Sequence, residues 1–470
     1  MPITAPRSSF PGCPPRTPRA LARGLTALVL TSLLLHPAPP AGADDELVFP
    51  PTLRDGGTSS RDLTERFLAP PAEAALAEDV GIASTPPTID LLLYPGQDYP
   101  GRPWSTWGEG VYADGVYYSG IGDHLGPAGN ALLFAYRPAP DEARQPGSLE
   151  TLLDLRQLLD LPEGHYTPAK FHTALGMGRD GNLYGATHRG STRVTTPENH
   201  FTGDWIVRHH PGENRSEVVV HAPVPGHCIP SGLLDPERLI FYGATTPGHD
   251  GATDGTHFFA YDIEAGRVLH TDPDGPSRGL ALASSSGRVY YTPGSGAGRL
   301  MRYDPAVDGP AVDVGESPGL RAASRETGDH RIYFANQGRD GQPTMLFELD
   351  TREETVTPRG PLAVGSQQYV TSLAVSADDR WLYYVPGAHG GAERDGSPVV
   401  QMDLQTGARK VLAFLHPYYE ERHGLALKGT YGVSVSDDGD RLFITWNASR
   451  GSRAWDCCAL TVIHIPDTER

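Results

Sequence analysis

Cysteine is scarce in this sequence of 470 residues, which contains four of them. Three, Cys228, Cys457 and Cys458, follow the N-terminal region, and an odd number excludes a complete disulfide framework. None of them has the C-x-x-C spacing of a zinc ribbon or a redox motif. The adjacent Cys457 and Cys458 leave two interpretations open, a vicinal disulfide or two buried thiols on a strand.

Long apolar runs and positive charge are also lacking. The apolar run from Leu25 to Leu35 is about half as long as the ~20 residues that span a bilayer. The net charge of −18 argues against nucleic acid or an anionic membrane surface as a partner. The G-x-S-x-G, P-loop and H-E-x-x-H motifs are absent, so the sequence points to none of the chemistries that they mark.

The N-terminal region has the pattern of a targeting segment. Arg16, Arg19 and Arg23 precede the apolar run, and Ala41-Gly42-Ala43 forms a small-x-small cleavage site. We therefore expect residues 1–43 to be a signal peptide and the mature protein to be secreted or periplasmic. Residues 44–87, rich in proline at both ends, are expected to be an N-terminal extension on the outside of the main domain.

A strand–turn–aromatic pattern recurs seven times in the rest of the chain. Clear copies read HTALGMGRDGNLYGATH (172–188) and LALASSSGRVYYTPG (280–294). The aromatic residues that follow the turns are Tyr118, Tyr184, Tyr242, Tyr290, Tyr333, Tyr383 and Phe443. Their separations, from 43 to 66 residues, are typical of four-stranded propeller blades with variable loops. The sequence thus predicts an all-β, seven-bladed propeller.

The two ends of the repeat region predict how the ring closes. The last repeat lacks a fourth strand, whereas TIDLLLY (88–94) is a strand without a blade of its own. If this N-terminal strand completes the last blade, both exposed edges disappear. We therefore expect residues 88–470 to form one seven-bladed domain, and the protein to be a monomer.

The repeat also predicts which side chains meet at the central channel. The first two strands of a blade form a hairpin, so His172 and His188 of the second blade should share one rim. Alignment on the turns places Arg278, Arg321 and Tyr431 at the level of His172. The third blade offers His227, and the sixth offers Gln367, Gln368 and Tyr369 just before its first strand. Arg189 follows His188 on the same face, whereas His209 and His210 fall far from the axis.

Arginines and imidazoles that converge on one rim indicate an anionic ligand, or a metal with an anionic substrate. A seven-bladed, exported propeller with His, Tyr and Arg at its funnel resembles the propeller polysaccharide lyases of the ulvan lyase and oligogalacturonate lyase types. The resemblance covers most of residues 88–466. It implies an acidic polysaccharide or oligosaccharide as the partner and β-elimination beside a uronate carboxylate as the reaction.

The resemblance also implies roles for the rim residues. His172 or His188 would take the proton, Tyr431 would protonate the leaving oxygen, and Arg189, Arg278 and Arg321 would bind the substrate. His172, His188 and His227, with Gln367 or Gln368, would imitate the divalent-cation site of the oligogalacturonate lyase type. The ion would be calcium, manganese or zinc.

Other interpretations remain open at this stage. The histidines could be bonded to backbone, and the arginines could pair with Glu109 in the channel. The whole ring could be a non-catalytic propeller that binds a glycan or a protein. A third class is a metal-dependent oxidoreductase or a gluconolactonase-like hydrolase, although Glu109 is the only obvious carboxylate for the acidic calcium site of a lactonase.

Overall fold

The chain from Leu47 onward forms one compact unit built almost entirely from β-strands. The computed structural model describes residues 47–141, 144–249, 255–295, 298–338, 343–451 and 455–470. The predicted signal peptide lies outside these residues. In the described part, none of the helices is long and apolar enough to cross a membrane.

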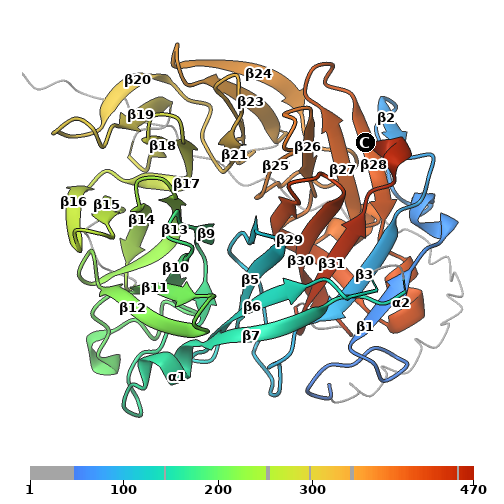
Figure 1. Cartoon of the computed structure of the whole chain (residues 1–470), viewed down its shortest axis with the longest axis horizontal. Helices are drawn as coiled ribbons and strands as arrows, with labels where there is room; N and C mark the ends of the chain where they lie inside the picture. The colour runs from blue at the N-terminus through green and yellow to red at the C-terminus, as the bar shows by residue number, and fades with distance from the viewer. Residues whose placement is uncertain (1–46, 142–143, 250–254, 296–297, 339–342, 452–454) are drawn as a thin grey trace, which may run out of the picture. The chain divides into compact units, whose positions relative to one another are not determined.

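Seven sheets are arranged around a central axis, which confirms the predicted seven-bladed propeller (Figure 1). Within each blade the strands are antiparallel and follow chain order from the axis outward. The strands of the first four blades are, in order, β4 (Val111–Ala113), β5 (Val116–Gly122), β6 (Ala131–Arg137) and β7 (Ser148–Asp154); β8 (Lys170–Phe171), β9 (Gly176–Met177), β10 (Leu183–His188), β11 (Trp205–His210) and β12 (Arg215–His221); β13 (His227–Asp235), β14 (Ile240–Pro247), β15 (Phe258–Asp262) and β16 (Arg267–Asp272); and β17 (Pro276–Ala283), β18 (Arg288–Pro293), β19 (Arg299–Tyr303) and β20 (Val312–Glu316).

The last three blades follow the same plan. Their strands are β21 (Ala322–Glu326), β22 (Arg331–Ala335), β23 (Met345–Asp350) and β24 (Thr355–Pro361); β25 (Ala374–Val375), β26 (Trp381–Tyr384), β27 (Pro398–Asp403) and β28 (Arg409–Phe414); and β29 (Ala426–Val435), β30 (Arg441–Ser449) and β31 (Cys457–His464). The described residues also form two α-helices, α1 (Leu155–Leu159) and α2 (Tyr418–His423), and four 3₁₀ turns, η1 (Glu65–Leu68), η2 (Pro197–Asn199), η3 (Ala392–Asp395) and η4 (Asp467–Glu469).

The seventh blade takes its fourth strand from the N-terminal side of the ring, as the sequence predicted. Strand β3 (Thr88–Leu93) pairs with β31 antiparallel, from Thr88 with His464 to Leu93 with Ala459. In Figure 1 the blue β3 therefore lies beside the red β31. Leu91 of this strand is fully buried in a core shared by the sixth and seventh blades.

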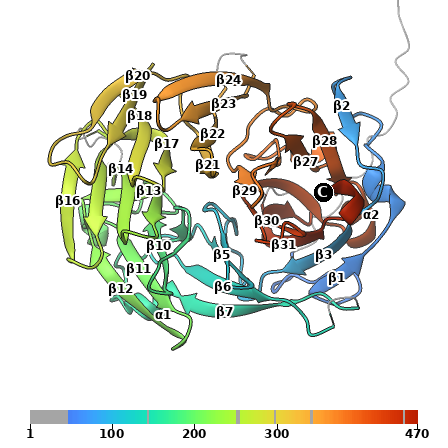
Figure 2. The same cartoon turned by 45° about the horizontal axis from the view of Figure 1, so that its top comes forward.

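The segment before β3 extends two sheets by a fifth strand. Strand β1 (Ser59–Asp62) pairs with β3 on the seventh blade, and β2 (Val80–Ile82) pairs parallel with β28 on the sixth (Figure 2). Residues 47–87 thus run along the outer edges of neighbouring blades. They cover backbone groups that an outermost strand would otherwise leave unpaired.

The repeated turn and aromatic have simple structural causes. The seven repeat aromatics all lie on the second strand of their blades and are buried, with relative exposures from 0% to 7%. Between β4 and β5, Asp114 and Gly115 adopt φ values of 50° and 80°. Two successive positive φ values are typical of the type I′ hairpin turn, which glycine and aspartate tolerate. The turns set the register, and the aromatics fill the space between blades.

Candidate functional site

A cavity of about 610 Å³ lies on the axis, between the innermost strands. Side chains from all seven blades reach its wall, including Trp107, His172, Pro230, Arg278, Arg321, Thr371 and Tyr431. Each stands near the start of its blade's innermost strand, so the seven form one rim. The cavity continues along the axis to Leu282, Ser284, Arg325 and Glu326, at the opposite ends of β17 and β21.

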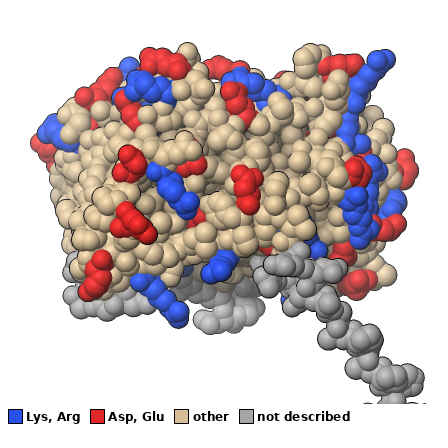
Figure 3. All heavy atoms as spheres, turned by 90° about the horizontal axis from the view of Figure 1, so that it is seen from below, with Lys and Arg blue, Asp and Glu red and all other residues tan. Residues whose placement is uncertain are grey.

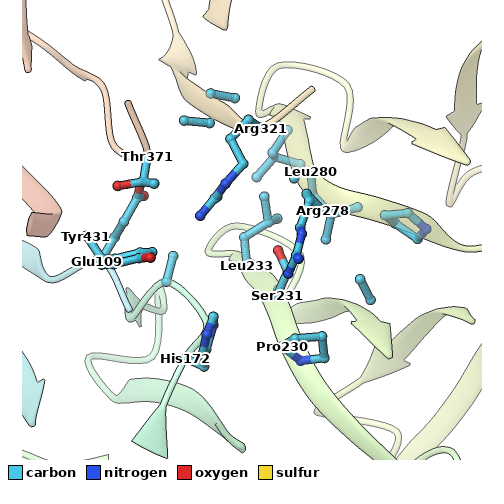
Figure 4. Close-up of a pocket in the computed structure, with 18 of the residues that line it drawn as sticks. Glu109, His172, Pro230, Ser231, Leu233, Arg278, Leu280, Arg321, Thr371 and Tyr431 are labelled. Atoms are coloured by element: carbon cyan, nitrogen blue, oxygen red, sulfur yellow. The ribbon is translucent and has the colours of Figure 1, made fainter. Parts of the chain in front are cut away.

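Arg278 and Arg321 carry the positive charge of this rim. Figure 4 shows Arg321 directed into the space between Tyr431 and Glu109 on one side and Arg278 on the other. In the described part of the chain neither guanidinium forms an ion pair with a carboxylate. Arg321 donates from Nε to the hydroxyl of Tyr369 at 2.6 Å, and its guanidinium carbon lies 5.3 Å from the centre of that ring. Two free guanidinium groups at one cavity are an anion-binding arrangement.

Other arginines of the protein form ion pairs with carboxylates. Charges of both signs are interspersed on the side of the molecule that Figure 3 shows. Elsewhere in the fold, Arg288 pairs with Asp304 at 2.9 Å, and Arg302 pairs with Glu354 at 2.9 Å. Arg278 and Arg321 differ from these arginines because they line a cavity and have no carboxylate partner in the described part of the chain.

His172 is packed between two aromatic neighbours at the rim. Its ring stacks on Trp107 with centroids 5.5 Å apart and planes 15° apart, and the ring of His188 meets it edge-on at 4.9 Å. Burial, together with the charge of Lys170, lowers the pKa of His172 to about 3. The imidazole is therefore neutral at pH 7 and can accept a proton. Burial also lowers the pKa of His188 well below its usual value.

Lys170 is a buried amine beside the same indole ring. Its Nζ lies 4.0 Å from the centre of the Trp107 ring, and the residue is 8% exposed. Within the described residues no carboxylate pairs with it. Burial, with a smaller contribution from Arg189, lowers its pKa from 10.5 to about 7. The amine is thus half protonated near neutral pH.

Tyr431 is hydrogen-bonded to a histidine that comes from a loop. Its hydroxyl and Nδ1 of His389 are 2.6 Å apart. Burial raises the pKa of Tyr431, so the phenol keeps its proton at neutral pH. Burial and the charges of Arg321 and Arg278 lower the pKa of His389. The pair can hand a proton to a group in the cavity.

Glu109 is the acidic member of the rim. Burial raises its pKa from 4.5 to about 7, although a hydrogen bond with Ser372 and the charge of Arg321 oppose the shift. Gly108 and Gly110 on either side allow a close approach, because a Cβ on Gly108 would lie 2.4 Å from the carbonyl oxygen of Thr173. The carboxyl group therefore changes its charge inside the pH range in which the protein would work.

The structure brings four of the predicted site residues, His172, Arg278, Arg321 and Tyr431, to one cavity. His188 stands directly behind His172. The other two, His227 and Arg189, do not line that cavity in the described structure, and both are engaged elsewhere.

His227 bonds from Nδ1 to the hydroxyl of Thr245 at 2.8 Å and contacts the ring of His257. Arg189 donates to the carbonyl oxygens of Pro247 and Gly248. His209 and His210, expected far from the axis, bond to Ser216 and Glu217 of the outermost strand β12. Cys457 and Cys458 are free, buried thiols.

Three contributors were missed by the sequence reasoning: Trp107, Lys170 and His389. Trp107 could have been found, because the repeat spacing carried back from His172 to the first blade ends one residue before it. Lys170 begins β8, two residues before His172, and a lone lysine gives no signal of burial. His389 lies in the loop after β26, where strand alignment has no predictive value.

Comparison with known proteins supports the fold but assigns the chain to no family. No protein-family model matches the chain, and a search of curated proteins finds no match. Among solved structures, an oligogalacturonate lyase in complex with manganese is similar, with a TM-score of 0.51 and 11% identity over 87% of this chain and 99% of that chain.

Two further structures show weaker likenesses. A chain of the mitotic checkpoint complex has a TM-score of 0.49 and 12% identity, over 87% of this chain and 99% of that one. A chain of a nidogen/laminin complex has a TM-score of 0.36 and 16% identity, over 52% and 83%. At such identities the likeness is one of fold.

Proposed function

We propose that the protein binds a uronate-containing saccharide in its axial cavity and cleaves it by β-elimination. The observation that carries this proposal is the pair Arg278 and Arg321, which line the cavity without a carboxylate partner among the described residues. A sugar carboxylate would supply the missing negative charge. Bidentate hydrogen bonds from guanidinium to carboxylate are short and strong, and they fix the orientation of the sugar ring.

The reaction needs the proton next to that carboxylate to become acidic. Arg278 and Arg321 would stabilise the negative charge that develops on the carboxylate when the C–H bond breaks. The neutral imidazole of His172 would take this proton, and the C–H electrons would form the new carbon–carbon double bond. The bond to the leaving oxygen then breaks, and the phenol of Tyr431 would give that oxygen its proton. Atoms and charges balance without another reactant.

Lys170 and His389 support these two roles. A base whose pKa is about 3 is weak, whereas an amine whose pKa is about 7 matches neutral pH better. Lys170 is therefore the second candidate base, two residues before His172 in the chain. His389 would relay a proton from solvent to Tyr431: its Nδ1–H would pass to the phenolate through the 2.6 Å hydrogen bond while Nε2 takes a proton from water.

A second candidate function, glycan binding without cleavage, rests on the aromatic side chains. Trp107 contacts Tyr431 at 4.8 Å, Trp455 at 5.4 Å and His389 at 6.1 Å between ring centroids. Such a cluster gives a sugar ring apolar faces to lie on, whether or not a bond is then broken. If residues 1–43 are a signal peptide, as expected, the protein would meet extracellular polysaccharides.

The test is incubation of the full mature chain with a panel of uronate polymers and oligomers. Cleavage by β-elimination produces an unsaturated sugar that absorbs ultraviolet light, and the proposal expects this absorbance with at least one substrate. His172→Ala should lower the rate about 10³-fold. His210→Ala, a histidine on an outer strand, should leave the rate unchanged.

Three outcomes separate the candidates. Absorbance that depends on His172 supports the lyase. Saccharide binding that needs Arg278 and Arg321, with no unsaturated product, supports the binding function. Neither binding nor product across the panel would overturn both.

A further inference from the structure

Three side chains that could ligate a metal meet behind the cavity wall. His188 ends β10, Asp204 precedes β11, and Cys228 is the second residue of β13. Their ligand atoms all lie within 4.8 Å of one another. In the described part of the chain, this is the group of histidine, cysteine and acidic side chains that lie close enough to share a metal ion. Asp204 and Cys228 are fully buried, and His188 is 9% exposed.

The imidazole of His188 has a polar atom whose hydrogen-bonding capacity is unsatisfied. Its Nδ1 is buried and has no hydrogen-bond partner in the described structure. It lies 4.0 Å from Oδ2 of Asp204, which is too long for a hydrogen bond. A buried polar atom without a partner costs about 1–3 kcal/mol. Two ligands of one tetrahedral ion, each bonded at ~2 Å, stand roughly 3.3 Å apart, so a small contraction would place an ion between these atoms.

The surroundings hold the carboxylate of Asp204 in one orientation. Its Oδ1 accepts hydrogen bonds from the hydroxyls of Tyr166, at 2.8 Å, and Thr187, at 3.1 Å. Its Oδ2 accepts a long bond, at 3.3 Å, from the backbone N–H of Ile229, and the thiol of Cys228 also donates a hydrogen bond to the carboxyl group. Outer partners of this kind are what fixes a ligating carboxylate in metal sites.

The three donors also indicate which ion would fit. They are one nitrogen, one carboxylate oxygen and one sulfur, and thiolate sulfur favours zinc over manganese, magnesium or calcium. Three protein donors leave one position of a tetrahedral zinc ion for water. A bound dication would hold the carboxylate and the thiolate ionised in this buried position.

We infer that His188, Asp204 and Cys228 form a zinc site. It shares His188 with the set that the resemblance implied, but it replaces His172 and His227 by Asp204 and Cys228. Because the ring of His188 meets that of His172 edge-on at 4.9 Å, the ion would fix both rings at the back of the cavity. This inference does not depend on the proposed lyase activity.

The test measures the metal rather than a reaction. The full mature chain is freed of metal with a chelator, reloaded with zinc or cobalt, and analysed for metal content. The expected result is one ion per chain, a thiolate-to-cobalt absorption band in the near ultraviolet, and a Tm that rises with added zinc. Manganese should give neither stoichiometric binding nor a comparable rise in Tm.

Variants then assign the ligands. Cys228→Ser should remove the cobalt band and weaken zinc binding at least about 100-fold, and His188→Ala should weaken it similarly. Cys457→Ser, which changes another buried thiol, should keep the band. If Cys228→Ser does not fold, the wild type still decides, because sub-stoichiometric metal and an unchanged Tm with zinc would overturn the inference. The three residues would then be a hydrogen-bonded network only.

Discussion

Arg321 and Arg325 stand at the two ends of one strand, β21, and line the same axial cavity. They are four residues apart, or about 13 Å along a strand. Arg325 is held by Asp379 at 2.6 Å and by the carbonyl oxygen of Glu326 at 3.0 Å. Arg321 has a phenol as its partner, and no carboxylate of the described chain pairs with it. The two ends of the cavity therefore differ in whether the protein itself satisfies the charge.

This difference separates a structural arginine from a binding one. At the Arg325 end, the guanidinium joins the fifth and sixth blades, and its charge is already paired with the carboxylate of Asp379. At the Arg321 end, the nearby Arg278, Lys170 and imidazoles would repel one another if several were charged, and burial lowers the pKa of Lys170 and His172 instead. Cations kept together without counter-charges are a cost to folding that an anionic ligand would offset.

The largest expected difference between the two ends of the cavity appears when each arginine is replaced in turn. Arg321→Ala should lower kcat/KM on a uronate substrate about 10²–10³-fold, because it removes a charge that stabilises the transition state. Arg325→Ala should change kcat/KM by less than about threefold and act on stability, where a half-exposed ion pair contributes up to about 1 kcal/mol. Steady-state kinetics and thermal unfolding measure the two effects. Equal losses of kcat/KM would show that the two ends do not differ in function.

The aromatic side of the rim should give a smaller effect. Trp107→Ala removes the ring that His172 stacks on and that Lys170 lies against, so saccharide affinity should fall about tenfold. Trp381→Ala is the matched control, since Trp381 lies on β26 beside Arg380 and Lys410, away from the rim. Calorimetric titration of both variants tests this. If Trp107→Ala bound the saccharide as tightly as the wild type, Trp107 would not be part of the binding site.

Removing one hydrogen bond tests how Arg321 is positioned. Tyr369→Phe deletes the hydroxyl that accepts from Arg321 at 2.6 Å. A hydrogen bond to a charged group is worth about 1.5–3 kcal/mol, and because this bond positions Arg321 without touching the sugar, only part of that energy should appear in the affinity. We expect a three- to tenfold loss of affinity for a uronate. The same change made in Arg321→Ala should have no further effect, because the two residues act together. Additive losses in this double-mutant cycle would contradict the positioning role.

The affinity for an anionic sugar should change a few-fold with pH. As pH rises through about 7, Glu109 gains a negative charge and Lys170 loses its positive charge, so affinity for an anionic sugar should fall. Glu109→Gln should reduce this fall. Titrations at pH 6 and pH 8 measure it, and an affinity that rises with pH would contradict the assignment.

Stability gives an independent readout of the same group. The folded-state pKa of Glu109 is raised above 4.5, so between about pH 4.5 and 7 the folded state binds more protons than the unfolded state. Glu109 should therefore contribute a decrease in the free energy of unfolding as pH rises across this window, whereas His172, whose pKa is lowered to about 3, contributes an increase below about pH 6.5. Glu109→Gln should remove the Glu109 contribution, so the slope of the variant should be more positive than that of the wild type. In the protein freed of metal, Asp204, whose pKa is raised from 3.8 to about 7, should contribute a decrease of the same sign. An unchanged slope in Glu109→Gln, measured by urea unfolding at several pH values, would contradict this.

The repeat predicted the fold because each blade has the same physical requirements. A hairpin turn needs aspartate and glycine at positions of positive φ, and the gap between blades needs a large ring on the second strand. Both requirements are local, so they recur in the sequence at readable intervals. The closing strand was predictable for a similar reason, since a propeller with an exposed edge is unfavourable.

The site was predictable wherever the spacing was followed strictly. Applied to the third and sixth blades, the spacing that gave Arg278, Arg321 and Tyr431 leads to Pro230 and Thr371, and both line the cavity. The chemically attractive neighbours His227 and Gln367 do not line it in the described structure. Asp395, for example, bonds to the backbone N–H of Gln367 in the loop before β25. The repeat spacing therefore predicted the residues at the axis better than residue type did.

Contacts between blades could not be predicted in this way. The convergence of His188, Asp204 and Cys228 depends on how the second and third blades pack, and the positions of His389 and Trp455 depend on long loops. These placements follow from tertiary packing, for which a single sequence without repeats at those positions holds no signal.

The strand β3 has a consequence for how the protein is made. Thr88 pairs with His464, so the seventh blade cannot form until almost the whole chain is available. A pairing over 376 residues has a high entropic cost of loop closure and is expected to come late in folding. Until then β3 and β31 each present one unpaired apolar edge, which makes the nearly complete ring prone to aggregate. A chain that crosses a membrane before it folds would delay this step further, and a periplasmic or extracellular chaperone that shields β3 would shorten its exposure.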